Sequence, residues 1–358
     1  MAIVFGTRPE IVKLAGVVRL LGPAARTVHT GQHYSPALSA AFLDDLGLGT
    51  PAVQLDVGGA SRGRQIGEAT AALDAHLTDD PPSAVVVQGD TNTGLAGALA
   101  ANAGGFPLLH VEAGLRSFDR AMPEEHNRVL VDHLADVCCA PTETSRANLL
   151  AEGVPDERVL VTGNTVVEAV LELLPDPSDR PDLLARWGLR ARGFVLATFH
   201  RPENVDDPHT LATILRALAD LPLPVLLPMH PRTAARAARF GLGTVAGGLR
   251  LCEPLGYAEF LGLAAECALL VSDSGGVQEE ASVLKRPVIV VRRSTERPEV
   301  QGTFATLVPP GPGICELAAD WIDGLAALHA RLEHEPCPYG DGTASARTVA
   351  AIRELAAS

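Results

Sequence analysis

The sequence predicts an α/β fold built from two doubly wound parallel sheets, and three observations carry this prediction. Short apolar runs alternate with helical patterns from one end of the chain to the other. The runs are apolar at consecutive positions, which is typical of parallel strands that helices cover on both faces. There are more of these runs than one such sheet holds at this chain length, so we expect two similar lobes.

Helical patterns lie between the predicted strands. The first helix begins beside Pro9, because proline suits the first turn of a helix, and it ends at Gly22. Its residues Ile11, Leu14 and Val18 lie on one apolar stripe. An amphipathic helix is also expected over 343–357. The predicted strands span residues 2–5, 84–88, 107–111, 137–140, 159–162, 194–198, 225–228, 249–252, 268–272 and 288–291.

A segment rich in proline and aspartate at 173–192 is the expected linker between the lobes. We therefore expect an N-terminal Rossmann-like lobe over 1–172 and a C-terminal Rossmann-like lobe over 173–342. The helix in 343–358 is expected to pack back on the first lobe. Ligands of such sheets bind outside the carboxyl ends of the strands, so the active site is expected in the cleft between the lobes.

The composition excludes several classes of protein. The 358 residues carry 29 Lys and Arg against 43 Asp and Glu, a net charge of −14, and 47% of them are hydrophobic. Such a hydrophobic content excludes a disordered chain, and the negative charge argues against nucleic acid or an anionic membrane as a partner. A small anionic substrate needs only a local basic pocket and stays compatible with this charge.

The sequence predicts a cytoplasmic protein that works without a metal or cofactor. No stretch approaches the roughly 18 consecutive apolar residues of a membrane span, and the N-terminus leads directly into a strand without a signal segment. The six cysteines lack metal-ligand spacing and are expected to be mostly buried thiols. There is no Asp-x-Asp pair and no His-Glu-x-x-His sequence, so metal catalysis is not favoured.

Polar residues follow the strands of the first lobe. Arg8, in the loop after the first strand, and Lys13 could bind an anion, although a tight turn with surface ions explains them equally well. Asp90 and Glu112 follow two later strands, and Glu124 lies at a helix start. Converging carboxylates would repel one another and raise at least one pKa, as acid/base catalysis near neutrality requires.

The second lobe contains a candidate phosphate site. Ser274, Gly275 and Gly276 follow a strand and open a helix, so that backbone N–H groups and the serine hydroxyl can meet a phosphate. Glu280, further along the same helix, could accept hydrogen bonds from ribose hydroxyls. His200 ends another strand of this lobe.

Taken in chain order, these segments resemble the non-hydrolysing UDP-N-acetylglucosamine 2-epimerases over nearly the whole chain. The order and spacing of the segments are specific, whereas each segment alone is not. The segments that carry the resemblance are Gly6-Thr-Arg-Pro-Glu-x-x-Lys13, Gln88-Gly-Asp-Thr, His110-Val-Glu-Ala-Gly-Leu-Arg116, Pro123-Glu-Glu-x-Asn-Arg128, Gly163-Asn-Thr165, His200-Arg201, Asp273-Ser-Gly-Gly-x-Gln-Glu-Glu280 and Thr295-Glu-Arg-Pro-Glu299.

The resemblance implies a glycosyltransferase-B-like fold, a homodimer, and reversible conversion of UDP-GlcNAc to UDP-ManNAc. UDP is eliminated to give 2-acetamidoglucal and then adds back, with the C2 proton delivered to the other face. The acid/base groups implied are Asp90, Glu112 and Glu124, with His200 assisting the departure of UDP. The implied substrate contacts are Arg8, Lys13, Ser274, Gly275, Gly276, Glu280 and Arg297.

Many bacterial members of this family bind a second UDP-GlcNAc as an activator. The residues that fit such an allosteric site are Gln32, His33, Arg201 and His230. The sequence departs from the family pattern at Ser35, where a glutamine is common in that site, and at Gly16, where proline is usual.

Three other functions stay open at this point. A hydrolysing 2-epimerase would release free UDP and ManNAc, although such enzymes typically open with Gly-Thr-Arg-Ala-Asp. A glycosyltransferase with the same lobes would need an acceptor. A regulator that only binds UDP-sugars would not need three carboxylates. The pathway that uses the product, whether for a polysaccharide or an antibiotic, is not set by the sequence.

Overall fold

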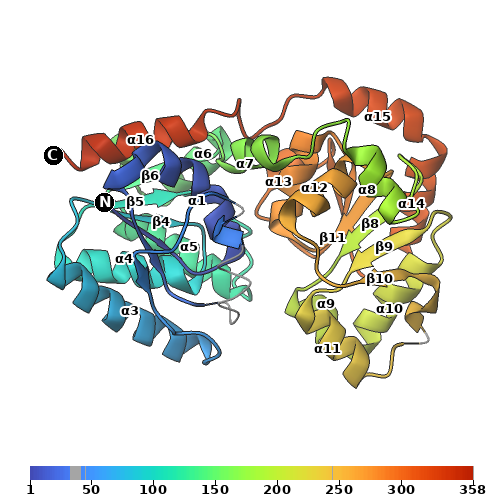
Figure 1. Ribbon diagram of the computed structural model, residues 1–358, viewed down its shortest axis with the longest axis horizontal. Coiled ribbons are helices and arrows are strands. Elements are labelled where there is room, and N and C mark those ends of the chain that lie inside the picture. Colours follow the sequence, from blue (N-terminus) through green and yellow to red (C-terminus); the bar gives the residue numbers. More distant parts are fainter. Residues whose placement is uncertain (33–41, 45, 244, 358) are drawn as a thin grey trace. The chain divides into compact units, whose positions relative to one another are not determined.

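The computed structural model describes residues 1–32, 42–44, 46–243 and 245–357, and the chain forms two compact units (Figure 1). Unit 1 comprises Met1–Ala169 together with Tyr339–Ser358, and unit 2 comprises Val170–Pro338. Each unit has one parallel sheet flanked by helices, so the predicted α/β fold with two Rossmann-like lobes is confirmed. The boundary between the units falls inside helix α7 (Val166–Leu173).

The sheet of unit 1 has seven parallel strands in the order β3-β2-β1-β4-β5-β6-β7. The strand order reverses between β1 and β4, which is where sheets of this kind bind ligands. Every residue of β1, β4 and β5 is buried, because helices cover both faces. The strands are β1 (Ala2–Phe5), β2 (Arg26–His29), β3 (Val53–Gln54), β4 (Val85–Gln88), β5 (Leu108–Val111), β6 (Val137–Ala140) and β7 (Val159–Val161).

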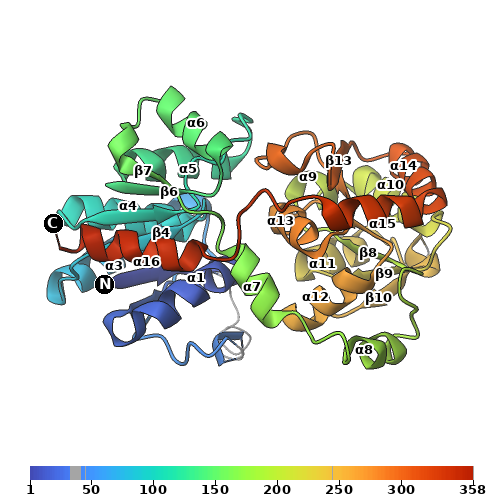
Figure 2. The same cartoon turned by 90° about the horizontal axis from the view of Figure 1, so that it is seen from above.

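The helices of unit 1 form two layers. Helix α16, drawn in red, lies beside α1 on one face of the sheet, whereas α3, α4 and α5 cover the other face (Figures 1 and 2). A Cβ atom on Gly16 of α1 would lie 2.5 Å from the Ser345 hydroxyl of α16, which explains why glycine suits this position. The helices are α1 (Arg8–Leu21), α3 (Arg62–Asp79), α4 (Asn92–Gly104), α5 (Pro123–Leu134), α6 (Glu143–Ala151), the first part of α7, and α16 (Ala344–Leu355).

Unit 2 repeats the arrangement with six parallel strands in the order β10-β9-β8-β11-β12-β13, which reverses between β8 and β11. Helix α12 packs against α8 and α13, whereas α10 packs against α9, α11 and α14. The strands are β8 (Val195–Thr198), β9 (Val225–Pro228), β10 (Arg250–Cys252), β11 (Leu269–Ser272), β12 (Val288–Val291) and β13 (Ala305–Val308). The helices are α8 (Arg180–Arg186), α9 (Pro202–Val205), α10 (Pro208–Ala219), α11 (Pro231–Arg239), α12 (Tyr257–Glu266), α13 (Gly275–Leu284), α14 (Gly313–Asp323) and α15 (Leu325–His334).

All ten predicted strands are present, each within about one residue of its predicted ends, but β2, β3 and β13 were not predicted. The apolar pattern of β2, which reads Arg-Thr-Val-His, is weak, and β3 has only two residues. Among the described residues, no helix is long and apolar enough to cross a membrane.

Candidate active site

A buried carboxylate organises the loop after β1. Glu10 is fully buried, and it accepts hydrogen bonds from the backbone N–H groups of Gly6 (2.9 Å) and Thr7 (2.8 Å) and from the Thr91 hydroxyl (2.6 Å). Burial raises the pKa of Glu10 to about 7, although these hydrogen bonds oppose the shift. Arg8 is half-buried at the start of α1, the helix that follows this loop, with its guanidinium carbon 5.8 Å from the ring centre of Phe42.

Glu112 follows β5, where its backbone adopts a left-handed φ of 69°. Its carboxylate forms a buried ion pair with the Lys13 ammonium of α1 and accepts a hydrogen bond from Asn164 Nδ2 at 3.1 Å. A neighbouring cation favours the ionised form of a carboxylate. Lys13, expected to contact the substrate, therefore also balances the charge of a proposed catalytic group.

Asp90 follows β4, directly beside β5 in the sheet, so that Asp90 and Glu112 lie at the same sheet edge. The buried guanidinium of Arg128 on α5 donates one hydrogen bond to Asp90 and another to Glu125. Asn127 Nδ2 also donates to the backbone oxygen of Asp90 at 2.8 Å. The positive charges of Arg128, beside Asp90, and of Lys13, beside Glu112, relieve the repulsion that was expected between the carboxylates.

The two neighbouring glutamates at the start of α5 have different surroundings. Glu125 is buried and accepts hydrogen bonds from Ser117 and Phe118 in the preceding loop, at 2.8 to 3.0 Å. Glu124, the residue predicted to be catalytic, is half-buried in the first turn of the helix. Glu125 therefore holds the loop, which leaves Glu124 as the partly exposed carboxylate of the pair.

A second buried network lies beneath these carboxylates. His110 Nδ1 is 2.6 Å from Asp132 Oδ1, and His110 Nε2 is 2.8 Å from the backbone oxygen of Gly89. Asp132 Oδ2 accepts hydrogen bonds from Gly114 N (3.1 Å) and from Arg116 Nη1 (2.7 Å). Burial acts to raise the pKa of Asp132, but His110 and Arg116 outweigh it and the pKa is lowered.

In unit 2, Asp273 organises the loop that follows β8. Its fully buried carboxylate accepts hydrogen bonds from the backbone N–H groups of His200 (3.1 Å) and Arg201 (3.0 Å) and from Asn204 Nδ2 (3.1 Å). The His200 side chain is 39% exposed. Partial removal of the His200 ring from solvent lowers its pKa. Asp273 opposes this effect, whereas the positive charges of nearby arginines add to it. The neutral imidazole is therefore favoured near pH 7.

Three arginines converge on Glu296. Arg292 Nη2 lies 2.9 Å from its carboxylate and Arg201 Nη2 lies 3.5 Å away, while Arg297 forms a third ion pair. Arg297 Nε also donates to Glu279 at 2.8 Å. Arg297, which was predicted to contact the substrate, is only 5% exposed. Two of its nitrogens bind the carboxylates of Glu279 and Glu296 within the protein.

The predicted phosphate loop caps α13, with Ser274 as the N-cap residue. The two glycines that follow have different surroundings. A Cβ atom on Gly275 would lie 2.7 Å from Arg297 Nη1, whereas one on Gly276 would have no described heavy atom nearer than Glu280 Oε1 at 3.8 Å. Gly275 is therefore required by the arginine cluster, and Gly276 leaves space beside the helix N-terminus.

Glu280 is buried in the same helix and is fixed by a tyrosine. The Tyr257 hydroxyl donates to Glu280 Oε1 at 2.9 Å. Burial, together with the negative charge of Glu280, raises the pKa of Tyr257 well above its usual value, so that its hydroxyl stays protonated.

The residues predicted for an allosteric site are spread over both units. Gln32 Oε1 accepts hydrogen bonds from the backbone N–H (2.9 Å) and the hydroxyl (2.8 Å) of Thr93 in unit 1. In unit 2 the rings of His200 and His230 lie 5.4 Å apart, and Arg201 is next to His200 in the chain. His33 lies outside the described residues, as does Ser35.

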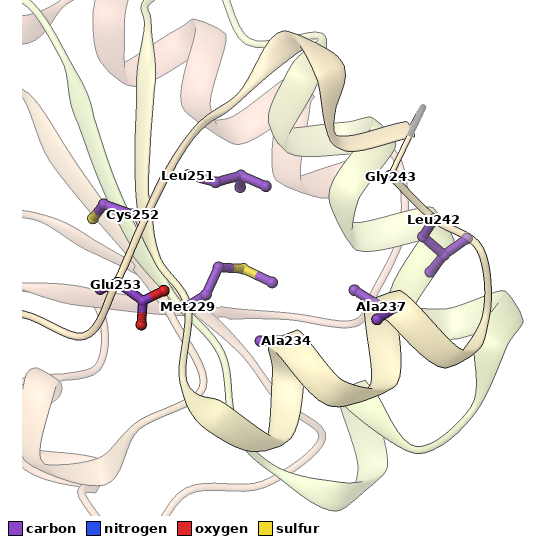
Figure 3. A pocket seen from close by; sticks show the side chains of 9 residues that line it. Met229, Ala234, Ala237, Leu242, Gly243, Leu251, Cys252 and Glu253 are labelled. Atoms are coloured by element: carbon purple, nitrogen blue, oxygen red, sulfur yellow. The ribbon is translucent and has the colours of Figure 1, made fainter.

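A mostly apolar cavity of about 540 Å³ lies in unit 2, beside α11 and β10 (Figure 3). None of the predicted site residues lines it. The described residues include no group of three His, Cys, Asp or Glu side chains placed to hold a metal ion. The cavity is lined by Met229, Ala234, Ala237, Ala238, Leu242, Gly243, Leu251, Cys252 and Glu253.

Comparison with known proteins decides the family. Residues 23–353 match the model of the UDP-N-acetylglucosamine 2-epimerase family. The chain belongs to this family. Its members are epimerases and therefore isomerases, which agrees with the resemblance seen in the sequence.

Relatives of this 2-epimerase family match along the whole chain. A UDP-N-acetylglucosamine 2-epimerase of Methanocaldococcus jannaschii is 37% identical, over 98% of this chain and 97% of the relative. The crystal structure of that enzyme in complex with UDP-GlcNAc and UDP covers 99% of both chains with a TM-score of 0.88. A UDP-2,3-diacetamido-2,3-dideoxy-D-glucuronate 2-epimerase of Pseudomonas aeruginosa is 34% identical, over 98% of this chain and 99% of the relative.

Sequence reasoning missed the buried partners of the site in this epimerase-family chain. Arg128, Asn164 and Glu296 each bind a residue that was predicted to act, yet none was given a role. Arg128 and Asn164 belong to two of the segments that carry the family resemblance, Pro123–Arg128 and Gly163–Thr165. Their place in these segments is the sequence feature that could have indicated a role. Nothing in the sequence indicated that Glu296 would bind three arginines.

Proposed function

We propose that this protein is a non-hydrolysing UDP-GlcNAc 2-epimerase that interconverts UDP-GlcNAc and UDP-ManNAc. The observation that carries the proposal is the pair of carboxylates Asp90 and Glu112, which follow adjacent strands and are each paired with a buried cation. Membership of the 2-epimerase family and relatives that match along the whole chain support the same conclusion.

The chemistry requires acid/base groups on two faces of the sugar. No carbonyl acidifies the C2 proton, so cleavage of the C1–O bond runs ahead of its removal. The elimination releases UDP and a proton and leaves 2-acetamidoglucal; re-addition of UDP at C1 then places a proton on the opposite face of C2. Asp90 and Glu112 are proposed as two of these acid/base groups, because Arg128 and Lys13 favour their ionised, proton-accepting forms.

Glu124 is proposed as a third acid/base group, because it is partly exposed whereas its neighbour Glu125 binds the adjacent loop.

Unit 2 is proposed as the UDP-binding lobe. The N-terminus of α13, with Ser274 and Gly276, would hold the diphosphate, since free backbone N–H groups and the helix dipole favour an anion there. His200 would donate a hydrogen bond to the departing UDP, where negative charge develops. Glu280, fixed by Tyr257, would accept hydrogen bonds from the ribose.

Arg8, Lys13, Gly275 and Arg297 complete the proposed substrate side of the site. Arg8 is partly exposed and could reach a phosphate directly. The contacts of Lys13 and Arg297 within the protein favour a supporting role, in which each fixes a carboxylate or a loop next to the substrate. Gly275 would act by leaving room for Arg297.

We extend the proposal to the domains, the oligomer and the cell compartment. The N-terminal lobe (1–172 with 343–358) would carry the acid/base groups and the C-terminal lobe (173–342) the nucleotide. All six cysteines are free thiols, which suits the cytoplasm. A homodimer and activation by a second UDP-GlcNAc through Gln32, Arg201 and His230 rest on the family resemblance; sedimentation and the dependence of rate on UDP-GlcNAc would test them.

The decisive experiment is incubation with UDP-GlcNAc in D2O, followed by NMR. We expect UDP-ManNAc with deuterium at C2, in equilibrium with UDP-GlcNAc and with little free UDP. Asp90→Asn and Glu112→Gln should lose most turnover while still binding UDP, whereas Asp156→Asn, at an exposed position of unit 1, should behave as the unmodified protein. No product and no exchange at C2 would refute the proposal.

The other functions give different outcomes in the same assay. Stoichiometric free UDP and ManNAc would indicate a hydrolysing epimerase, and sugar transfer to an added acceptor without exchange at C2 would indicate a glycosyltransferase. A parallel reaction with UDP-2,3-diacetamido-2,3-dideoxy-D-glucuronate is needed, because one relative is named for that substrate. If deuterium exchange at C2 were faster with this compound than with UDP-GlcNAc, the proposed substrate would be wrong but the proposed reaction, 2-epimerisation, would stand.

A further inference from the structure

His110 has no part in the chemistry described above, yet it contacts the loop of one proposed catalytic carboxylate directly. It lies on β5 and is fully buried. Its Nε2 atom is 2.8 Å from the backbone oxygen of Gly89, the residue that immediately precedes Asp90. A carbonyl oxygen only accepts hydrogen bonds, so Nε2 must carry a proton and donate it.

The other ring nitrogen connects His110, through Asp132, to the chain on either side of Glu112. His110 Nδ1 is 2.6 Å from Asp132, and the same carboxylate accepts a hydrogen bond from the backbone N–H of Gly114 at 3.1 Å. His110 precedes Glu112 by two residues and Gly114 follows it by two. Asp132 therefore holds the chain on both sides of Glu112.

The turn that contains Glu112 needs such support, whereas the turn before Asp90 uses a glycine that adopts its conformation readily. Gly89 has a φ of 67° and Glu112 a φ of 69°, and the left-handed conformation is unfavourable for a glutamate. Conformations of this kind persist where the surrounding contacts hold them. The contacts of His110 and Asp132 are buried and short, so they can hold the backbone around Glu112 in this conformation.

We propose that His110 is a positioning residue for the epimerisation. It acts on Asp90 through the backbone oxygen of Gly89 and on Glu112 through Asp132. The proposal rests on the proposed function, because it assumes that these two carboxylates exchange the C2 proton. Displacement of a reacting group by about 1 Å can slow a reaction by roughly 10²-fold, so loss of the Gly89 link should slow turnover. Loss of the Nδ1 contact alone should matter less, because Asp132 keeps its contacts with Gly114 and Arg116.

Two substitutions separate the two links. In His110→Asn the amide lies close to the position of Nδ1, so that it can bind Asp132 but cannot reach Gly89. In His110→Gln the amide nitrogen lies close to the position of Nε2, so that it can donate to Gly89. The matched control is His329→Asn in unit 2, because His329 is also fully buried and its Nε2 lies 2.8 Å from the backbone oxygen of Ala268.

The readouts are kcat and KM for UDP-GlcNAc, deuterium exchange at C2, UDP affinity and the thermal unfolding midpoint. We expect His110→Asn to lower kcat and the exchange rate roughly 10- to 100-fold. KM should change less than about twofold, since His110 positions groups for the chemical step and is not proposed to touch the substrate. UDP affinity should be unchanged, and His110→Gln should recover most of the lost kcat. His329→Asn should lower the unfolding midpoint without lowering kcat.

Three results would overturn the proposal: His110→Asn with unchanged kcat, His110→Gln no more active than His110→Asn, or His329→Asn with an equal loss of kcat. Should His110→Asn fail to fold, His110→Gln decides, since its retained or lost kcat tests the Gly89 link directly. Lack of C2 exchange by the unmodified protein would instead contradict the proposed function, so the two failures are distinguishable.

Discussion

The Glu10 carboxylate accepts a hydrogen bond from the Thr91 hydroxyl at 2.6 Å, and this contact joins the loop after β1 to the loop after β4. Arg8 follows the first loop directly, as the first residue of α1, and the second loop contains Asp90. Because burial raises the pKa of Glu10 to about 7, the group that joins the two loops changes its protonation in the physiological range. The stability of unit 1 should therefore depend on pH through this residue.

Glu10→Gln should remove this dependence. The carboxyl binds protons more tightly in the folded chain (pKa about 7) than in the unfolded chain (4.5). Its stabilising contribution is therefore complete below pH 4.5 and is lost as the pH rises through 7. The difference is on the order of 3 kcal/mol. Glutamine has a similar shape and does not titrate.

Urea unfolding of both proteins at pH 5 and pH 8 measures this effect. The free energy of unfolding of Glu10→Gln, relative to that of the unmodified protein, should be higher at pH 8 than at pH 5. A difference between the two proteins that does not change with pH would show that Glu10 titrates normally in the folded chain.

Arg128→Lys tests whether one guanidinium holds both Asp90 and Glu125. Lysine keeps the charge but lacks the planar fork that reaches two carboxylates. We expect kcat to fall by at least about tenfold, and the free energy of unfolding to fall by about 1–3 kcal/mol, because a buried carboxylate loses a partner. The matched control is Arg146→Lys, whose ion pair with Asp156 is more exposed and contributes less than about 1 kcal/mol. Equal effects of the two substitutions in chemical unfolding and steady-state kinetics would contradict the role of Arg128.

Much of the fold could be predicted from the sequence, because buried parallel strands give continuous apolar runs. Two of the strands that escaped prediction, β2 and β3, lack such runs. β2 includes Arg26 and His29, and β3 is a two-residue edge strand beside it. These strands depend on pairing with a neighbour that is distant in sequence, as when Val28 pairs with Val53. Local patterns carry little information about such pairing.

The site was predictable only in part, for a related reason. Residue type and position after a strand identified Asp90 and Glu112, but the cations that compensate them come from other elements. Lys13 reaches Glu112 across 99 residues of sequence, and Arg128 reaches Asp90 across 38. The motifs contained these residues, whereas only the folded structure shows which charges meet.

Alanine substitutions of the neighbouring glycines at the start of α13 should affect different properties: Gly275→Ala should lower stability, whereas Gly276→Ala should weaken UDP binding. Gly275→Ala would place a Cβ atom 2.7 Å from both Arg297 Nη1 and Glu296 Oε1, so we expect a loss of about 1–3 kcal/mol in the free energy of unfolding. Gly276→Ala meets no such contact and should leave stability nearly unchanged, but it should weaken UDP binding if the diphosphate lies against this residue. Thermal unfolding and calorimetric titration with UDP distinguish the two effects; unweakened UDP binding by Gly276→Ala would move the diphosphate away from it.

Lys13→Met should shift the pH dependence of turnover. The ammonium of Lys13 favours the ionised form of Glu112, so its removal should make that buried carboxylate harder to ionise. If ionised Glu112 accepts the C2 proton, the acidic limb of the kcat profile should move to higher pH, by about 1 unit or more. Lys285→Met is the matched control, because Lys285 is the other lysine of the chain and donates to the backbone oxygen of Glu335 in unit 2. An acidic limb at the same pH in Lys13→Met and in the unmodified protein would show that Glu112 is not the group whose ionisation limits turnover.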